Sequence, residues 1–146
     1  MSDVLGVNKT KIDTPTPANR LKPGEYDGRV KVMTDLFEAL ALVQGSTIKM
    51  GGKIPKGAIV LAVLLTCDAL GGSSTLDIGD AEDDDRYFSA HDSSAALINE
   101  PGDEVDGVNY EVDETDADNL DSQIVITTAG ASITGTIKLA ILYAHD

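Results

Sequence analysis

The stretch that decides the fold class is Ala58-Ile59-Val60-Leu61-Ala62-Val63-Leu64-Leu65-Thr66, the longest apolar run of this 146-residue chain. Pro55 and Gly57 precede it and Asp68 follows it. An apolar run of this length between turn residues is typical of a central strand buried on both faces. It is far shorter than the span of a bilayer, so we expect no membrane association.

The segments before this run also have β character. Residues 29–33 alternate polar and apolar side chains, as expected of a strand with one wet face. Residues 36–43 suit a helix or a strand, and we favour a strand because a lone helix would interrupt a series of sequential strands. Residues 47–50 predict another strand, which the turn Gly51-Gly52 would end.

The segments after the run continue the pattern. Loops are expected at residues 68–74 and 99–107, and a hairpin turn at 128–132. About eight short strands at this spacing predict an all-β fold, a single jelly-roll-like β-sandwich formed by residues 25–146. The strands expected here lie at residues 75–78, 86–90, 108–112, 123–128 and 133–143, and residues 94–98 suit a strand or a helical turn.

The core of such a sandwich must be aliphatic, because the chain has no Trp, two Phe and four Tyr. Cys67 is the single cysteine and follows an apolar stretch. With no second thiol for a disulfide or a paired-cysteine metal site, we interpret it as a buried structural thiol.

Residues 1–24 contain three prolines and little apolar periodicity, which predicts an extended N-terminal arm. Charge also separates the two ends of the chain. Nine of the eleven basic residues lie in residues 1–56 beside six acids, whereas residues 57–146 hold two bases and nineteen acids. A mildly basic front end and an acidic body suggest a component that attaches by one end and presents the other to water.

The basic side chains of the arm are the predicted contact residues, and we expect them to pair with acids on a partner protein. A net charge of −14 argues against nucleic acid as that partner, because phosphate binding needs a clustered basic face. The predicted contact residues are Lys9, Lys11, Arg20, Lys22 and Arg29.

The strongest candidate for chemistry is the acidic cluster at residues 77–85, where Asp77, Asp80, Asp83 and Asp85 could offer oxygen ligands to Ca²⁺ or Mg²⁺. The spacing matches no EF-hand loop, and a run of acids is more often a solvated turn. We therefore expect no bound metal and keep these four carboxylates as a weak alternative.

Residues suited to catalysis are scarce. His91 and His145 are the two histidines, and neither has a cysteine or a second histidine at ligand spacing. The serines near His91 lack a nucleophile-elbow sequence. The N-terminus also lacks the basic and apolar regions of a signal peptide. We expect a protein that is no enzyme, needs no cofactor, and is made in a cytoplasm.

The middle of the chain resembles the small β-rich virion proteins of tailed bacteriophages, over about residues 26–98. The matching residues mark turns and core positions and form no catalytic signature. They are Ile54-Pro55-Lys56-Gly57-Ala58-Ile59-Val60, Asp68-Ala69-Leu70-Gly71, Ser74-Thr75-Leu76-Asp77-Ile78-Gly79-Asp80-Ala81-Glu82-Asp83 and Asp85-Arg86-Tyr87.

This resemblance implies a head decoration (cement) protein, which forms trimers on the outer capsid and locks neighbouring major capsid subunits together. The implied partners are the major capsid protein and two further copies of the chain. The implied location is the capsid surface of the virion, after synthesis in the host cytoplasm. Two alternatives remain open: another virion component, such as a tail, neck or fibre-base protein, and a lectin-like module that binds sugar or Ca²⁺ through residues 77–85.

Overall fold

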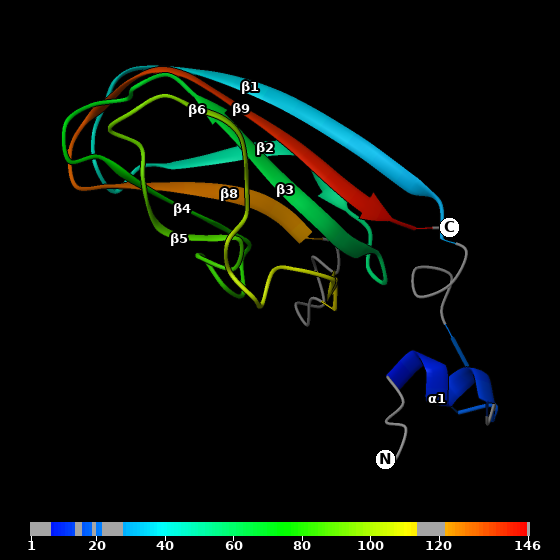
Figure 1. Ribbon diagram of the computed structural model, residues 1–146. Coiled ribbons are helices and arrows are strands. Elements are labelled where there is room, and N and C mark those ends of the chain that lie inside the picture. The colour runs from blue at the N-terminus through cyan, green and yellow to red at the C-terminus, as the bar shows by residue number, and fades with distance from the viewer. Residues whose placement is uncertain (1–6, 14–15, 19, 22–27, 114–121, 146) are drawn as a thin grey trace.

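The computed structural model describes residues 7–13, 16–18, 20–21, 28–113 and 122–145. Within these residues the chain forms two packed β-sheets and one short helix (Figure 1). The elements, in chain order, are α1 (Val7–Asp13), β1 (Val30–Leu42), β2 (Thr47–Ile54), β3 (Ile59–Cys67), β4 (Thr75–Gly79), β5 (Phe88–Asp92), β6 (Leu97–Pro101), β7 (Tyr110–Glu111), β8 (Ser122–Ala129) and β9 (Ile133–Ala144).

The strands are divided into one five-stranded sheet and one four-stranded sheet. The first, which we call sheet A, has the order β1-β9-β3-β6, and β7 pairs with β3; the second, sheet B, has the order β2-β8-β4-β5. All strand pairings among the described residues are antiparallel. The all-β sandwich is thereby confirmed. The partners β1 and β9, β2 and β8, β3 and β6, and β4 and β5 nest within one another along the chain, and on that ground the jelly-roll topology is retained as a prediction.

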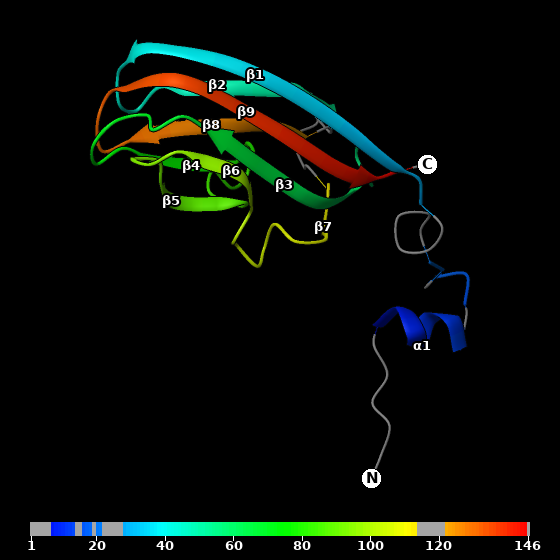
Figure 2. The same ribbon diagram turned by 45° about the horizontal axis from the view of Figure 1, so that its top comes forward.

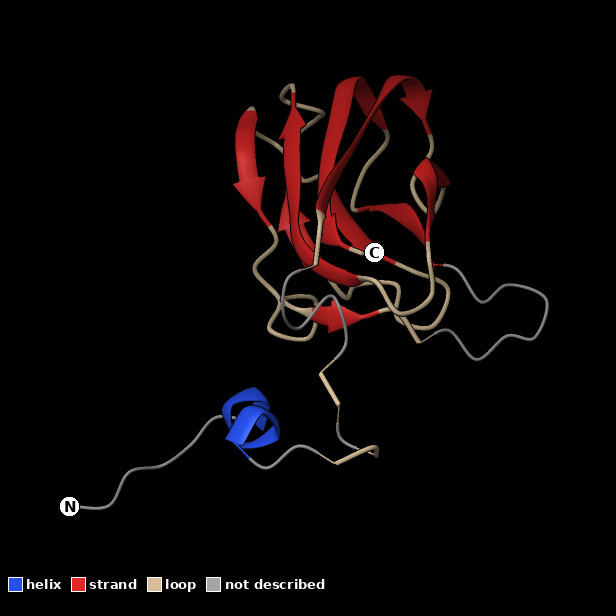
Figure 3. Cartoon of the chain, turned by 90° about the vertical axis from the view of Figure 1, so that its right-hand side faces the viewer, coloured by secondary structure: helices blue, strands red, loops and turns tan. Residues whose placement is uncertain are grey.

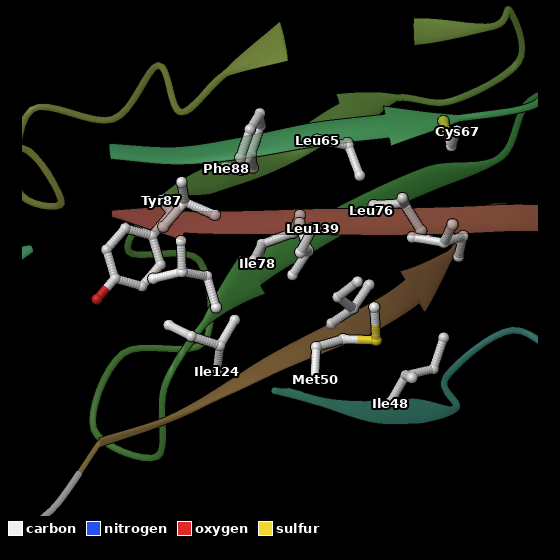
Figure 4. Close-up of a cluster of buried hydrophobic side chains, with 14 of the residues drawn as sticks. Ile48, Met50, Leu65, Cys67, Leu76, Ile78, Tyr87, Phe88, Ile124 and Leu139 are labelled. Carbon is white, nitrogen blue, oxygen red and sulfur yellow. The ribbon is translucent and has the colours of Figure 1, made fainter. Parts of the chain in front are cut away.

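The core lies between the sheets and is aliphatic, as expected. Alternate residues of β8 show how the sequence builds it: Ile124 and Ile126 are buried, whereas Gln123 and Val125 between them are half-buried. Figure 4 shows side chains of both sheets meeting across the core. Cys67 is among them with 5% exposure, and burial raises the pKa of its thiol, as expected of a structural cysteine.

The central apolar run forms β3, inside sheet A, as predicted. Its burial differs from the prediction, because only one face of the strand is fully covered. Val63 and Leu65 are buried, whereas Leu64 and Thr66 on the other face are half-buried. The strand is therefore central in its sheet but not covered on both faces by this chain.

Residues 36–42 belong to β1, so the favoured strand is confirmed there. Four other predictions were wrong. The turn at residues 128–132 joins β8 of sheet B to β9 of sheet A, so it is no hairpin. Gly51 and Gly52 lie inside β2, where a positive φ of 67° at Gly51 makes an irregularity and no chain reversal. Residues 99–101 extend β6, although we expected a loop. Of residues 108–112, only the pair Tyr110–Glu111 is strand, because its partner β3 is already paired with β6 further along.

The arm also departs from the prediction, because residues 7–13 form the helix α1 instead of an extended chain. These seven residues contain no proline, and Lys9 Nζ lies 2.6 Å from Asp13 Oδ1, one turn further along. In Figures 2 and 3, α1 lies apart from both sheets. The division at residue 24 between arm and body stays a prediction. No helix in the described part of the chain is long and apolar enough to cross a membrane.

Candidate functional site

The predicted contact residues of the arm lie on separate elements. Lys9 and Lys11 are on α1, where a basic residue in the last turn interacts favourably with the helix dipole. Arg20 is exposed between the helix and the body. Arg29 is exposed immediately before β1, and its carbonyl accepts a hydrogen bond from the backbone N–H of His145, at 3.0 Å. Lys22 is outside the described residues.

Asp80, one of the four cation-ligand candidates, has a structural task instead. Its side chain is fully buried, and its Oδ1 accepts the backbone N–H groups of Glu82 and Asp83 at 3.1 and 3.0 Å. Arg86 Nε donates to its Oδ2 at 2.7 Å. These bonds occupy both carboxylate oxygens, so Asp80 holds the turn after β4 and is not a free ligand.

Arg86 extends this network to β7. Its guanidinium carbon lies 3.8 Å from the centroid of the Tyr110 ring, and the Tyr110 hydroxyl donates to Asp113 at 3.0 Å. Burial disfavours the charged guanidinium, but the hydrogen bond and charge of Asp80 outweigh it and raise the pKa of Arg86. Burial also raises the pKa of Tyr110. One arginine therefore ties two acidic loops together.

The acids that do come together are Asp83, Asp84 and Asp85, whose ligand atoms lie within 4.8 Å of one another. The hydrogen bond with Asp85 raises the pKa of Asp83, whereas the bond from the Ser89 hydroxyl lowers the pKa of Asp85. The sequence-based set of Asp77, Asp80, Asp83 and Asp85 stays a weak prediction, and the structure places Asp83 and Asp85 of this set close together. Asp77 instead accepts the backbone N–H of Ala90, a residue with positive φ in β5. An exposed acidic turn alone does not indicate a metal site.

A surface that the sequence did not reveal lies on the outside of sheet A. On β1, β9 and β3, inward residues such as Phe37, Leu139 and Leu65 pack in the core. The residues that alternate with them point away from the core. We define the outer face of sheet A by the three cross-strand rows Val32–Leu142–Ala62, Thr34–Ala140–Leu64 and Leu36–Lys138–Thr66, and by the pair Glu38–Thr136.

This face is apolar and open. Val32 is 62% exposed and Leu36 is 50% exposed. A shallow hollow of about 590 Å³ runs across it, between Leu36, Leu64 and Asn99 among others. The sequence concealed the face because the alternation at residues 29–33 suggested that the valines point inward. The structure instead directs Met33 toward the core and leaves Val30 and Val32 exposed.

Comparison with known proteins gives one clear direction. No protein-family model and no curated protein matches the chain. It is similar to a chain of the cyanophage Pam1 capsid asymmetric unit, with 28% identity and a TM-score of 0.69, over 91% of this chain and 98% of that chain. The chain resembles phage capsid components.

A chain in the capsid of Ralstonia phage GP4 has the same fold, with a TM-score of 0.60 over 87% of this chain and 92% of that chain, at 18% identity. Both similarities extend over nearly the whole length of the other chain. The resemblance to small β-rich phage virion proteins is confirmed.

Proposed function

We propose that this chain is a capsid decoration protein, which binds the outer surface of the major capsid shell as an oligomer and stabilises the head against the pressure of the packaged genome. The observation that carries this proposal is the similarity to a chain of the Pam1 capsid asymmetric unit over 98% of that chain. The comparisons support a structural role in a phage virion; decoration is our more specific inference.

The arrangement of charge supports attachment through the arm. Lys9 and Lys11 lie on α1, which Figure 1 shows outside the sandwich, and Arg20 follows this helix in the chain. The body carries the acids, for example on the turn at residues 83–85. A basic arm is attracted to acidic patches on a shell, while an acidic body stays hydrated. Several weak arms on one oligomer would bind tightly through multivalency.

Under this proposal the chain has no catalytic activity. In the described residues, Asp80 and Asp77 accept hydrogen bonds from the protein's own backbone, from Arg86 and from the Ser122 hydroxyl, which suits structural roles. His91 contacts Asp103 at 3.5 Å and packs edge-on against Phe88. These contacts hold the loop at Asp103 against β5, which also suits a structural role.

The test is co-sedimentation with phage heads that lack this protein. Full-length protein, a variant without residues 1–24, and a variant with Lys9, Lys11, Arg20, Lys22 and Arg29 changed to Glu are compared. We expect saturable uptake of the full-length protein and a higher temperature of DNA release, with both effects lost in the two variants and weakened by salt. No uptake of the full-length protein would contradict the proposal and favour a tail, neck or fibre-base role.

A further inference from the structure

The strand β1 differs from β6, β2 and β5, the other strands at the ends of the two sheets. It has 13 residues, and its register with β9 is unbroken from Val30 to Ala39. β5 and β6 have 5 residues each, with a shifted register and a positive φ at Ala90 and Asn99. The register of β2 shifts after Met50. Sheets protect their edges by short strands and bulges, so among the described residues β1 has the one long regular edge.

Two hydrogen bonds show which backbone groups of β1 point to its open edge. Thr136, opposite Glu38, donates its N–H to Asp68 beyond β3, so the pair of β1 and β9 at this point is not joined by backbone hydrogen bonds. The N–H of Leu36 donates to the side chain of Asp35, in agreement with this alternation. Bonded and non-bonded pairs alternate along an antiparallel ladder. Even-numbered residues of β1 therefore direct their N–H and C=O groups away from β9: Val32, Thr34, Leu36 and Glu38.

These backbone groups are available to a partner. The N–H groups of Val32, Thr34 and Glu38 have no hydrogen-bond partner in the part of the chain that the structure describes. Residues 30–42 contain no proline, so every residue of the strand keeps its N–H. The side chains of the same even-numbered residues lie on the outer face of sheet A, where Val32 is 62% and Leu36 is 50% exposed. A long regular edge with free donors and acceptors is a template for an added strand.

We propose that the open edge of β1 binds an extended segment of the capsid shell protein as an additional strand of sheet A, an inference that rests on the proposed function. The backbone groups of Val32 and Thr34 supply the central hydrogen bonds, and apolar side chains of the segment lie beside Val32 and Leu36 on the outer face. The segment it fits therefore has apolar residues at every second position.

The other strands available to this edge fit it less well. In the arm, residues 7–13 are helical, and Pro15 and Pro17 both lack an N–H on the same side of an extended chain. In a second copy, β1 can pair with β1 about a two-fold axis, which does not build the trimers that the resemblance implies. The remaining sheet edges of a second copy are short or irregular.

The test compares two proline variants that each remove one N–H from an open edge. Thr34→Pro does this on β1 without loss of a hydrogen bond to β9. Thr47→Pro on β2 is the matched control. The N–H of Thr128 donates to the carbonyl of Ser46 at 3.0 Å, so at the next pair the N–H of Thr47 also points to an open edge. Both threonines are exposed.

Uptake of each protein by phage heads that lack it is measured by co-sedimentation over a range of concentrations. We expect Thr34→Pro to bind at least about tenfold more weakly than the wild type, and Thr47→Pro to match the wild type. Urea unfolding midpoints check that both variants are folded. Hydrogen exchange of the head-bound wild type, followed by mass spectrometry, needs no variant. The amides of Val32 and Thr34 should exchange more slowly when bound, and that of Thr47 should not change.

The proposal is overturned if Thr34→Pro is folded and binds like the control, or if the amides of β1 gain no protection on heads. Sedimentation velocity of the free wild type adds a further check. A two-copy complex that Thr34→Pro dissociates would overturn the proposal and assign the edge to a second copy. Uptake of the wild type tests the proposed function separately. Heads that bind both proline variants equally would retain decoration and exclude this contact, whereas absence of wild-type uptake would overturn both.

Discussion

Arg86 and Asp80 form a nearly buried ion pair, with 2.7 Å between Nε and Oδ2 and side-chain exposures of 12% and 0%. The pair joins the turn after β4 to β7, because the same guanidinium covers the ring of Tyr110. This ion pair gives Arg86 a structural role in the strongly acidic half of the chain.

Replacement of Arg86 by Met should therefore destabilise the fold by about 3–5 kcal/mol, since the carboxylate of Asp80 would stay buried without its partner charge. Lys49→Met is the control, because it removes one positive charge from an exposed position and should change stability by less than about 0.5 kcal/mol. Urea unfolding followed by circular dichroism measures both. Equal midpoints for the two variants would show that the pair contributes little.

Two glycines near the same end of β8, Gly45 before β2 and Gly130 after β8, allow a matched test of backbone strain and packing. Gly45 and Gly130 have similar positive φ angles of 81° and 79°. A Cβ at Gly45 meets open space, whereas at Gly130 it would overlap the carbonyl oxygen of Ser73. Gly45→Ala should lower the free energy of unfolding by about 1 kcal/mol, from backbone conformation alone. Gly130→Ala should lower it by at least about 2 kcal/mol more. The measurement is the difference in unfolding free energy, and similar losses would contradict the predicted overlap.

Asp35 predicts a pH dependence of stability. Its carboxylate accepts the backbone N–H of Gly51 at 2.7 Å and that of Leu36 at 2.8 Å, and these bonds lower its pKa below the ordinary value of 3.8. A pKa that is lower in the folded than in the unfolded state stabilises the fold. This stabilisation is present when the pH is above the ordinary pKa, and it is lost as the pH falls through the folded-state pKa.

Asp35→Ala should consequently cost about 0.5–1 kcal/mol at neutral pH, a modest loss because the side chain is exposed. The difference from the wild type should shrink toward zero once the pH falls below the lowered pKa of the folded state, because Asp35 is then protonated in the folded and the unfolded protein. Unfolding free energies of the two proteins across this range provide the check. A difference that stays constant with pH would mean that the ionised carboxylate is not what ties β1 to β2.

Deletion of residues 1–24 should leave the unfolding midpoint of the body unchanged. The buried core residues run from Ala39 to Ala144, and α1 lies apart from both sheets. Thermal unfolding of the full-length and shortened proteins measures this, with retention of β-sheet circular dichroism as the control for folding. A lowered midpoint would show that the arm packs on the sandwich, and loss of capsid uptake could then no longer be assigned to the arm alone.

Strands with a strong pattern were predictable. The apolar run at residues 58–66 and the β-branched residues at 123–128 indicated their elements correctly, because burial in a sheet favours apolar and β-branched side chains at those positions. Short elements were not. Whether residues 108–112 pair depends on space beside β3, and the helix at residues 7–13 depends on local bonds such as Lys9 to Asp13.

The candidate sites show the same division. The basic arm and the acidic turn can be identified from residue types. The structural role of Asp80 cannot be identified from the sequence, because a carboxylate that binds a metal ion and one that binds an arginine look alike there. Arg86 lies six residues from Asp80, and only the turn between them brings Nε within 2.7 Å of the carboxylate.

The sequence by itself determined the all-β class, the aliphatic core and the separation of a basic front end from an acidic body, since each follows from which residue types occur and with what period. Only the tertiary structure decided which face of each strand is covered. Val32 and Met33 are both apolar neighbours, and the pairing of β1 with β9 sends one to the open face and the other to the core. Because a shift of one residue exchanges the two faces of a strand, the open apolar face of sheet A is a property of strand register.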